Sequence, residues 1–334
     1  MRETRAPRAR AAPAPPRAPR LPRGDAAPGP RCHTRPIRCR ARSSWDFLRH
    51  PPPADPAVGR QEEARTADEI PRDRCGPCTA QGDTVSVERT GGRELLGIHH
   101  VTAIAGDPQE NVDFYVRRLG LRLVKKSVNQ DDPSTYHLFY ADGAGNPGTD
   151  LTFFPSPNAA RGRPGAGQAI SVAFAVPERS LSYWIARLRE SGVPVSGPRA
   201  RFDEEVIAFS DPHGLSLEFV ASAETEHRQP WAAWEDGPIP PQHAIRGIHA
   251  VTLEEAALDP TSAFLTGTLG FRRLRETGGR VRHGVGGGGS GALLDLLARP
   301  DEPPGRIAVG TIHHVAWRTP NADEQERWWE EIQA

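Results

Sequence analysis

Apolar and polar residues alternate over short runs from Leu95 onward, and turn residues separate these runs. Residues 135–140 and 150–154 follow the two-residue period of strands, whereas Leu181, Trp184, Ile185 and Leu188 recur at the spacing of an amphipathic helix. The pattern therefore predicts short strands and short helices in alternation throughout the C-terminal part of the chain.

This pattern repeats. The stretch Gly97-Ile-His-His-Val-Thr returns as Gly247-Ile-His-Ala-Val-Thr, a third copy starts at Gly310, and a weaker one starts at Ala169. Fourteen positions after the second residue of each His-His or His-Ala pair stands an aromatic residue: Phe114, Phe264 or Trp328. Such spacing indicates four tandem copies of one structural unit.

Each copy is interpreted as a βαβββ module, in which a strand, an amphipathic helix and three further strands follow one another. One module exposes a sheet face, so we expect an α+β fold whose modules pair into curved mixed sheets around a cavity. The predicted boundaries are a disordered tail over 1–93, modules over 94–160, 165–222 and 244–300, a linker over 223–243, and an incomplete fourth module over 309–334.

The first 93 residues have a different composition. Residues 1–60 hold 13 of the 34 prolines, and residues 1–42 carry twelve arginines but few apolar side chains. A segment of this kind cannot bury enough apolar surface to fold, which predicts disorder. All four cysteines lie here, and neither the Cys75-Gly-Pro-Cys78 pair nor the Cys32 and Cys39 pair has the sequence context of a zinc knuckle or redox motif.

Charge and hydropathy exclude several classes of function. The 42 basic and 42 acidic residues balance, which argues against a nucleic-acid partner, and the sequence has neither a membrane-spanning run nor a secretory signal. Because the modules contain no cysteine, they need no oxidising compartment, and the expected location is the cytoplasm. Homo-oligomer formation is left open.

The modules resemble those of the vicinal oxygen chelate superfamily, which includes glyoxalase I, bleomycin-resistance proteins and extradiol dioxygenases. The closest resemblance is to four-module ring-cleaving dioxygenases that act on hydroquinones and catechols. The segments that carry it span about residues 94–334: Gly97-Ile-His-His-Val-Thr-Ala-Ile, Leu121-Arg-Leu-Val-Lys-Lys, Tyr136-His-Leu-Phe-Tyr-Ala-Asp, Gly148-Thr-Asp-Leu-Thr-Phe-Phe-Pro, Pro241-Gln-His-Ala-Ile-Arg-Gly-Ile-His and Gly310-Thr-Ile-His-His-Val-Ala.

In this family the first and the last strand of a module each offer one inward position to a metal. The first-strand positions correspond here to His100, Ser171, Ala250 and His314, in module order. The last-strand positions correspond to Thr152, Glu218 and Asp295. We therefore expect module one to pair with module four and bind metal through His100 and His314, and modules two and three to form a pair without metal.

The third ligand implied by the resemblance is a Glu. By the spacing of the other modules it falls at about residues 359–366, so the sequence is interpreted as C-terminally truncated within module four. Two His and one carboxylate on one face of Fe(II) leave positions for a bidentate diol and for O2. The resemblance also places His99, His313 and Thr102 beside the ligands, where they would handle the diol proton or steady the oxygen intermediate.

Other candidates are interpreted as structural. His249 precedes Ala250 rather than a ligand, and Glu218 and Asp295, which have no His partners in their pair, are interpreted as structural or solvent-facing. The strand with His137 could line the cavity, but its aromatic residues indicate ordinary packing. The glycine-rich run over 284–291 lacks the Lys-Ser/Thr ending of a phosphate loop and is expected to form a hairpin connection.

The leading hypothesis is an Fe(II)-dependent ring-cleaving dioxygenase that inserts O2 into a small aromatic diol. The alternatives are a glyoxalase-type isomerase and a metal-free module that binds small molecules. Because the third ligand is expected outside the 334 residues, an inactive chain is a further alternative.

Overall fold

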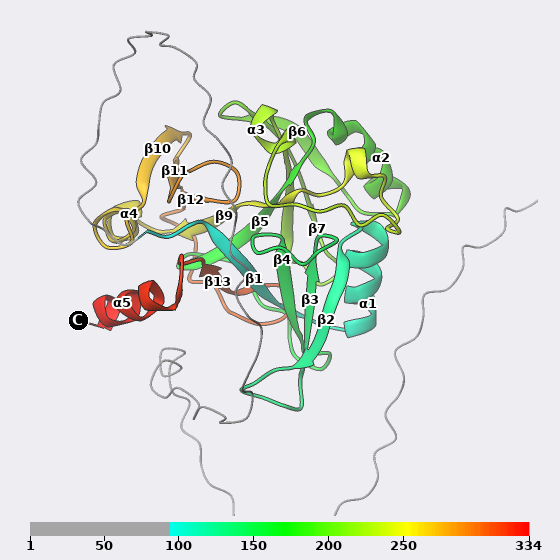
Figure 1. Cartoon of the computed structure of the whole chain (residues 1–334), viewed down its shortest axis with the longest axis horizontal. Coiled ribbons are helices and arrows are strands. Elements are labelled where there is room, and N and C mark those ends of the chain that lie inside the picture. The colour runs from blue at the N-terminus through cyan, green and yellow to red at the C-terminus, as the bar shows by residue number, and fades with distance from the viewer. Residues whose placement is uncertain (1–93, 334) are drawn as a thin grey trace, which may run out of the picture. The chain divides into compact units, whose positions relative to one another are not determined.

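The computed structural model describes residues 94–333, and these residues belong to one compact unit (Figure 1). The predicted disorder of residues 1–93 and the interpretation of the four cysteines lie outside the described residues. None of the described helices is both long enough and apolar enough to span a bilayer.

Module one begins with β1 and continues into a helix that is capped at its N-terminus by Asp107. The Asp107 carboxylate accepts the backbone N–H groups of Gln109 and Glu110, and Pro108 opens the first turn. The helix ends before Gly120, whose φ of 73° few other residues adopt. Its elements are β1 (Ile98–Ala105), α1 (Pro108–Val112), a π-helix (Asp113–Arg118), β2 (Arg122–Val128), β3 (Tyr136–Ala141) and β4 (Asp150–Pro155).

The next two modules repeat this order. Module two comprises β5 (Gln168–Val176), a 3₁₀ turn (Glu178–Ser180), α2 (Leu181–Glu190), β6 (Ser196–Arg201), β7 (Glu204–Ser210) and β8 (Ser216–Ala221). The short α3 (Ala223–Glu226) and a 3₁₀ turn (Pro241–His243) lie in the connection. Module three comprises β9 (Gly247–Glu255), α4 (Leu258–Gly267), β10 (Arg272–Thr277), β11 (Arg280–Gly284) and β12 (Leu293–Ala298).

The described part of module four consists of β13 (Ile312–Trp317) and α5 (Ala322–Gln333). β13 joins the edge of module one, which gives a five-stranded sheet in the order β13-β1-β4-β3-β2. β5 and β9 pair antiparallel and join modules two and three in an eight-stranded sheet, in the order β10-β11-β12-β9-β5-β8-β7-β6. This strand pairing confirms the predicted association of module one with four and of module two with three.

The apolar stripe predicted for the helix of module two is part of the core. Leu181, Trp184 and Leu188 of α2 are buried. The Trp184 ring lies 4.4 Å from that of Phe219 on β8, and its indole N–H donates to the backbone oxygen of His243 at 3.0 Å. The helix thus covers its sheet through apolar contacts, with the one polar atom of the tryptophan satisfied.

Two carboxylates of module one have contrasting environments. Asp142 accepts the backbone N–H groups of Ala144, Gly145 and Asn146 and thereby organises the loop before β4. Asp150, the first residue of β4, has a buried Oδ1 without a hydrogen-bond partner among the described residues. Burial, and then the charge of Asp142, raise the pKa of Asp150 to about 7.

The Asp150 carboxylate makes the fold sensitive to pH. Because its pKa is higher in the folded state than in the unfolded state, stability falls as pH rises from about 4 to about 7 and stays low above that range. Replacement of Asp150 by Asn should therefore stabilise the protein at pH 8, by up to about 4 kcal/mol, and the gain should vanish near pH 4.

Urea unfolding of both proteins at pH 4 and pH 8 measures this difference. Asp301→Asn, on an exposed loop, serves as the control. A gain in the free energy of unfolding that is equal at the two pH values would contradict the assigned role of Asp150.

Candidate metal centre

The pairing of β1 with β13 brings two imidazoles together. Thr102 lies opposite His314 and His100 opposite Ala316 in this antiparallel ladder. The Nε2 atoms of His100 and His314 are 3.1 Å apart, although 214 residues separate them in sequence. Both residues are predicted ligands, and the structure places their side chains in direct contact.

The residue before each of these histidines contacts it through ring nitrogens. Nδ1 of His99 lies 3.0 Å from Nδ1 of His100, and Nδ1 of His313 lies 2.8 Å from Nδ1 of His314. A register shift of β1 between Ile98 and His100 marks a local bulge, a feature that redirects side chains. These contacts engage Nδ1 of His100 and His314, while their Nε2 atoms face each other.

A chain of polar side chains leads from His314 to His137, which is not among the site residues predicted from the sequence. Thr102 Oγ1 lies 3.0 Å from His314 Nε2 and 2.7 Å from Thr152 Oγ1, which in turn lies 2.9 Å from His137 Nε2. The His137 ring also packs against Phe154, with 4.5 Å between centroids. On β3, Phe139 lies opposite Thr152 and His137 lies two residues away on the same face, so the two-residue period of β3 was the available signal.

Partial burial makes the cluster electrically neutral at physiological pH. Desolvation, followed by the charge of His314, lowers the pKa of both His100 and His137 to about 4. The pKa of His314 also falls to about 4, through desolvation and the neighbouring His313. Neutral imidazole is the form that coordinates metals, so no proton needs to be displaced from these rings near pH 7.

The two imidazoles fit a metal ion as neighbouring ligands. Nitrogen ligands lie at about 2.1 Å from a metal such as zinc, so two of them at right angles are separated by about 3 Å, close to the observed distance. Among residues 94–333 no group of three or more His, Cys, Asp or Glu side chains is arranged to hold a metal. His100 and His314 are thus two candidate ligands among the described residues.

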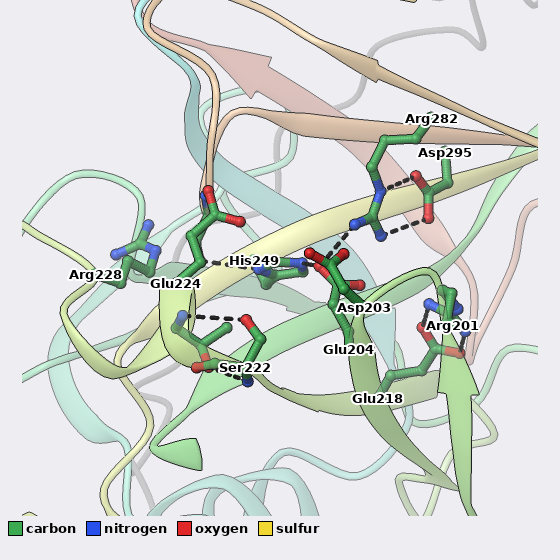
Figure 2. Close-up of polar contacts among 12 residues, drawn as sticks. Arg201, Asp203, Glu204, Glu218, Ser222, Glu224, Arg228, His249, Arg282 and Asp295 are labelled. Atoms are coloured by element: carbon green, nitrogen blue, oxygen red, sulfur yellow. Dashed lines mark hydrogen bonds and ion pairs between the residues drawn. The ribbon is translucent and has the colours of Figure 1, made fainter. Parts of the chain in front are cut away.

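The corresponding positions between modules two and three hold ion pairs instead. Both oxygens of Glu218 accept from Arg201, and both oxygens of Asp295 accept from Arg282, as Figure 2 shows. Arg282 also reaches Glu204, which bonds to His249 Nε2 at 2.8 Å. Glu218, Asp295 and His249 are buried within this network, so the two carboxylates are structural, and their solvent-facing alternative is wrong.

The remaining candidates are packing or loop residues. Tyr140 is fully buried and donates its hydroxyl to Asn111, whereas Tyr136 is exposed. The glycine-rich segment connects the antiparallel strands β11 and β12, as predicted, and its Ser290 hydroxyl lies 2.9 Å from His249 Nδ1.

Comparison with known proteins gives consistent matches over the described modules. The Bacillus subtilis (strain 168) protein named "Putative ring-cleaving dioxygenase MhqO" is 41% identical over 236 residues, which cover 71% of this chain and 73% of that protein. A "Chlorohydroquinone/hydroquinone 1,2-dioxygenase" of Sphingobium indicum is 33% identical over 235 residues, with 69% of this chain and 72% of that protein covered.

A crystal structure of a Bacillus subtilis protein superimposes with a TM-score of 0.67 at 40% identity, over 72% of this chain and 76% of that one. The family model of the Glyoxalase/Bleomycin resistance protein/Dioxygenase superfamily matches residues 97–219 and 247–334. These segments cover all four modules and both histidine pairs. The chain therefore belongs to the Glyoxalase/Bleomycin resistance protein/Dioxygenase superfamily.

Proposed function

We propose that this protein is a non-haem Fe(II)-dependent dioxygenase that opens the ring of a small aromatic diol, a hydroquinone or a catechol. The observation that carries the proposal is the 3.1 Å approach of the neutral His100 and His314 imidazoles. The names of relatives that are 33–41% identical, one of them a hydroquinone dioxygenase, support the same reaction class.

In this proposal His100 and His314 hold the iron through Nε2. The third ligand in this proposal is a Glu about 45–52 residues after His314, at the spacing of the other modules. Bound Fe(II) would supply the chemistry that brings the diol oxygens and O2 together and permits electron transfer between them. The protein is assigned to the cytoplasm, since the modules contain no cysteine.

The neighbouring polar residues would move and hold protons. Thr102 Oγ1 lies beside His314 Nε2 and would orient the diol hydroxyl, while His99 and His313 would fix the ring orientation of the ligands through Nδ1. His137 has a pKa of about 4, so it is neutral at pH 7 and able to accept a hydrogen bond from a substrate hydroxyl. Its position next to Phe154 places an aromatic surface beside this acceptor.

His100→Ala and His314→Ala test the metal ligands. Each variant should weaken Co(II) binding at least a hundredfold in anaerobic optical titrations, because removal of one imidazole leaves an incomplete ligand set. Fe(II)-loaded variants should also lose O2 uptake with hydroquinone or catechol by at least a thousandfold.

His227→Ala is the matched control, since His227 is exposed and lies outside the histidine cluster. Wild-type Co(II) affinity in either ligand variant would refute the metal centre. If the wild type binds Co(II) but its Fe(II)-loaded form takes up no O2 with either diol, the proposed reaction is refuted and the metal centre is not.

Thr102→Val and Thr102→Ser test the proposed role of the hydroxyl. Valine keeps the volume of the buried side chain but removes Oγ1, so we expect a ten- to hundredfold fall in kcat with hydroquinone. Serine keeps the hydroxyl and should retain most of the activity.

Stopped-flow O2 consumption and Co(II) titration of both variants separate turnover from metal binding. Equal kcat values for T102V and T102S would show that the hydroxyl takes no part in turnover. A loss of Co(II) affinity in T102V alone would assign Thr102 to ligand orientation rather than to proton handling.

A further inference from the structure

Modules two and three form a hollow at the position that corresponds to the histidine centre of modules one and four. It measures about 640 Å³, within the range of small-molecule sites, and residues of every strand from β5 to β12 line it. Ser171 and Glu218, the first-strand and last-strand positions of module two, are both in its wall. Arg199, Arg201, Arg280 and Arg299 also line it.

The hollow is related to the histidine centre by the module repeat. His137 contacts Thr152, fifteen residues later, and Arg280 contacts Asp295, also fifteen residues later. Arg280 Nη1 donates to Asp295 and to Thr252. Thr252 occupies the module position of Thr102, which bonds to Thr152 in module one. Module three thus places a cation where module one places a neutral imidazole.

The positive charges of this region exceed the negative ones. Glu218 is shared by Arg199 and Arg201, and Asp295 by Arg280 and Arg282. Glu204 also pairs with Arg282, and the rim of the hollow adds Arg299 and Glu254. Burial, and then the charge of Glu302, raise the pKa of Glu254, whereas Arg299 lowers it.

Arg280 is only partly compensated, because it shares the Asp295 carboxylate with Arg282. Its side chain is 14% exposed, and burial followed by the charge of Arg201 lowers its pKa. Its hydrogen bonds within residues 94–333 use Nη1 alone. The rest of its planar guanidinium, together with Arg199 and Arg299, is available to an acceptor in the hollow.

The rest of the wall suits an organic body rather than a bare inorganic ion. Ile170, Phe202 and Leu297 contribute apolar surface next to the arginines. A planar carboxylate matches the fork of a guanidinium, as the Arg201–Glu218 pair in Figure 2 shows for a side-chain carboxylate at this place. Apolar surface beside guanidinium groups that still have unused N–H donors suits the binding of an organic acid.

We propose that the hollow between modules two and three binds a small organic carboxylate, with Arg280 and Arg299 as its main contacts. This site is separate from the histidine centre and does not depend on the function assigned there. It would allow a carboxylic acid to bind the protein while the diol site is occupied.

Benzoate is the probe, titrated into the full-length protein by calorimetry at pH 7.5. We expect saturable binding with one site, at least tenfold weaker in the Arg280→Gln/Arg299→Gln double variant. Asp295 keeps its contacts with Arg282 in this variant, so the buried network should remain. Arg189→Gln, on the exposed side of α2, is the control and should bind benzoate as the wild type does.

Three further arms make the test specific. Benzamide, the neutral counterpart, should bind at least tenfold more weakly, and the His100→Ala/His314→Ala protein should bind benzoate normally, which excludes a metal-centre complex. Inorganic phosphate should not compete. The proposal would be overturned if wild type and R280Q/R299Q, both with cooperative thermal unfolding, bound benzoate with equal affinity. It would also be overturned if benzoate showed no saturable binding, or if phosphate bound and benzoate did not.

Discussion

The antiparallel pairing of β1 with β13 is the interaction on which the candidate centre depends. It joins the first strand of module one to the first strand of module four and sets Thr102 opposite His314. No local sequence feature could bring these side chains together, because 214 residues separate His100 from His314. In modules two and three the first strands, β5 and β9, pair with each other, and β1 pairs with β13 in the other sheet.

The two module pairs show how one scaffold supports different chemistry. Between modules one and four the inward positions carry imidazoles and hydroxyls that are neutral near pH 7. Between modules two and three they carry carboxylates held by arginines, with Glu218 and Asp295 both buried. A buried carboxylate that already accepts from a guanidinium is not free to coordinate a cation, so the ion pairs of Glu218 and Asp295 disfavour metal binding in the second pair.

Much of the architecture was accessible from the sequence because repetition and period are local signals. The two Gly-Ile-His copies, together with the further copies that start at Ala169 and Gly310, indicated four modules, and the absence of histidine from the inward positions of modules two and three indicated the pairing. The helix of module one was less predictable, since its change from α to π geometry at Asp113 depends on packing. His137 was missed because its relation to Thr152 arises from strand register, which β-branched and aromatic patterning does not specify.

The separation of β1 and β13 in sequence also bears on the order of folding. β1 is synthesised about two hundred residues before its partner β13, and contacts between residues so far apart in sequence form slowly. Until then β1 is an open edge, able to pair with another chain. The histidine cluster can therefore form only after β13 has been synthesised, and a nascent chain that stalls before β13 keeps the edge of β1 exposed.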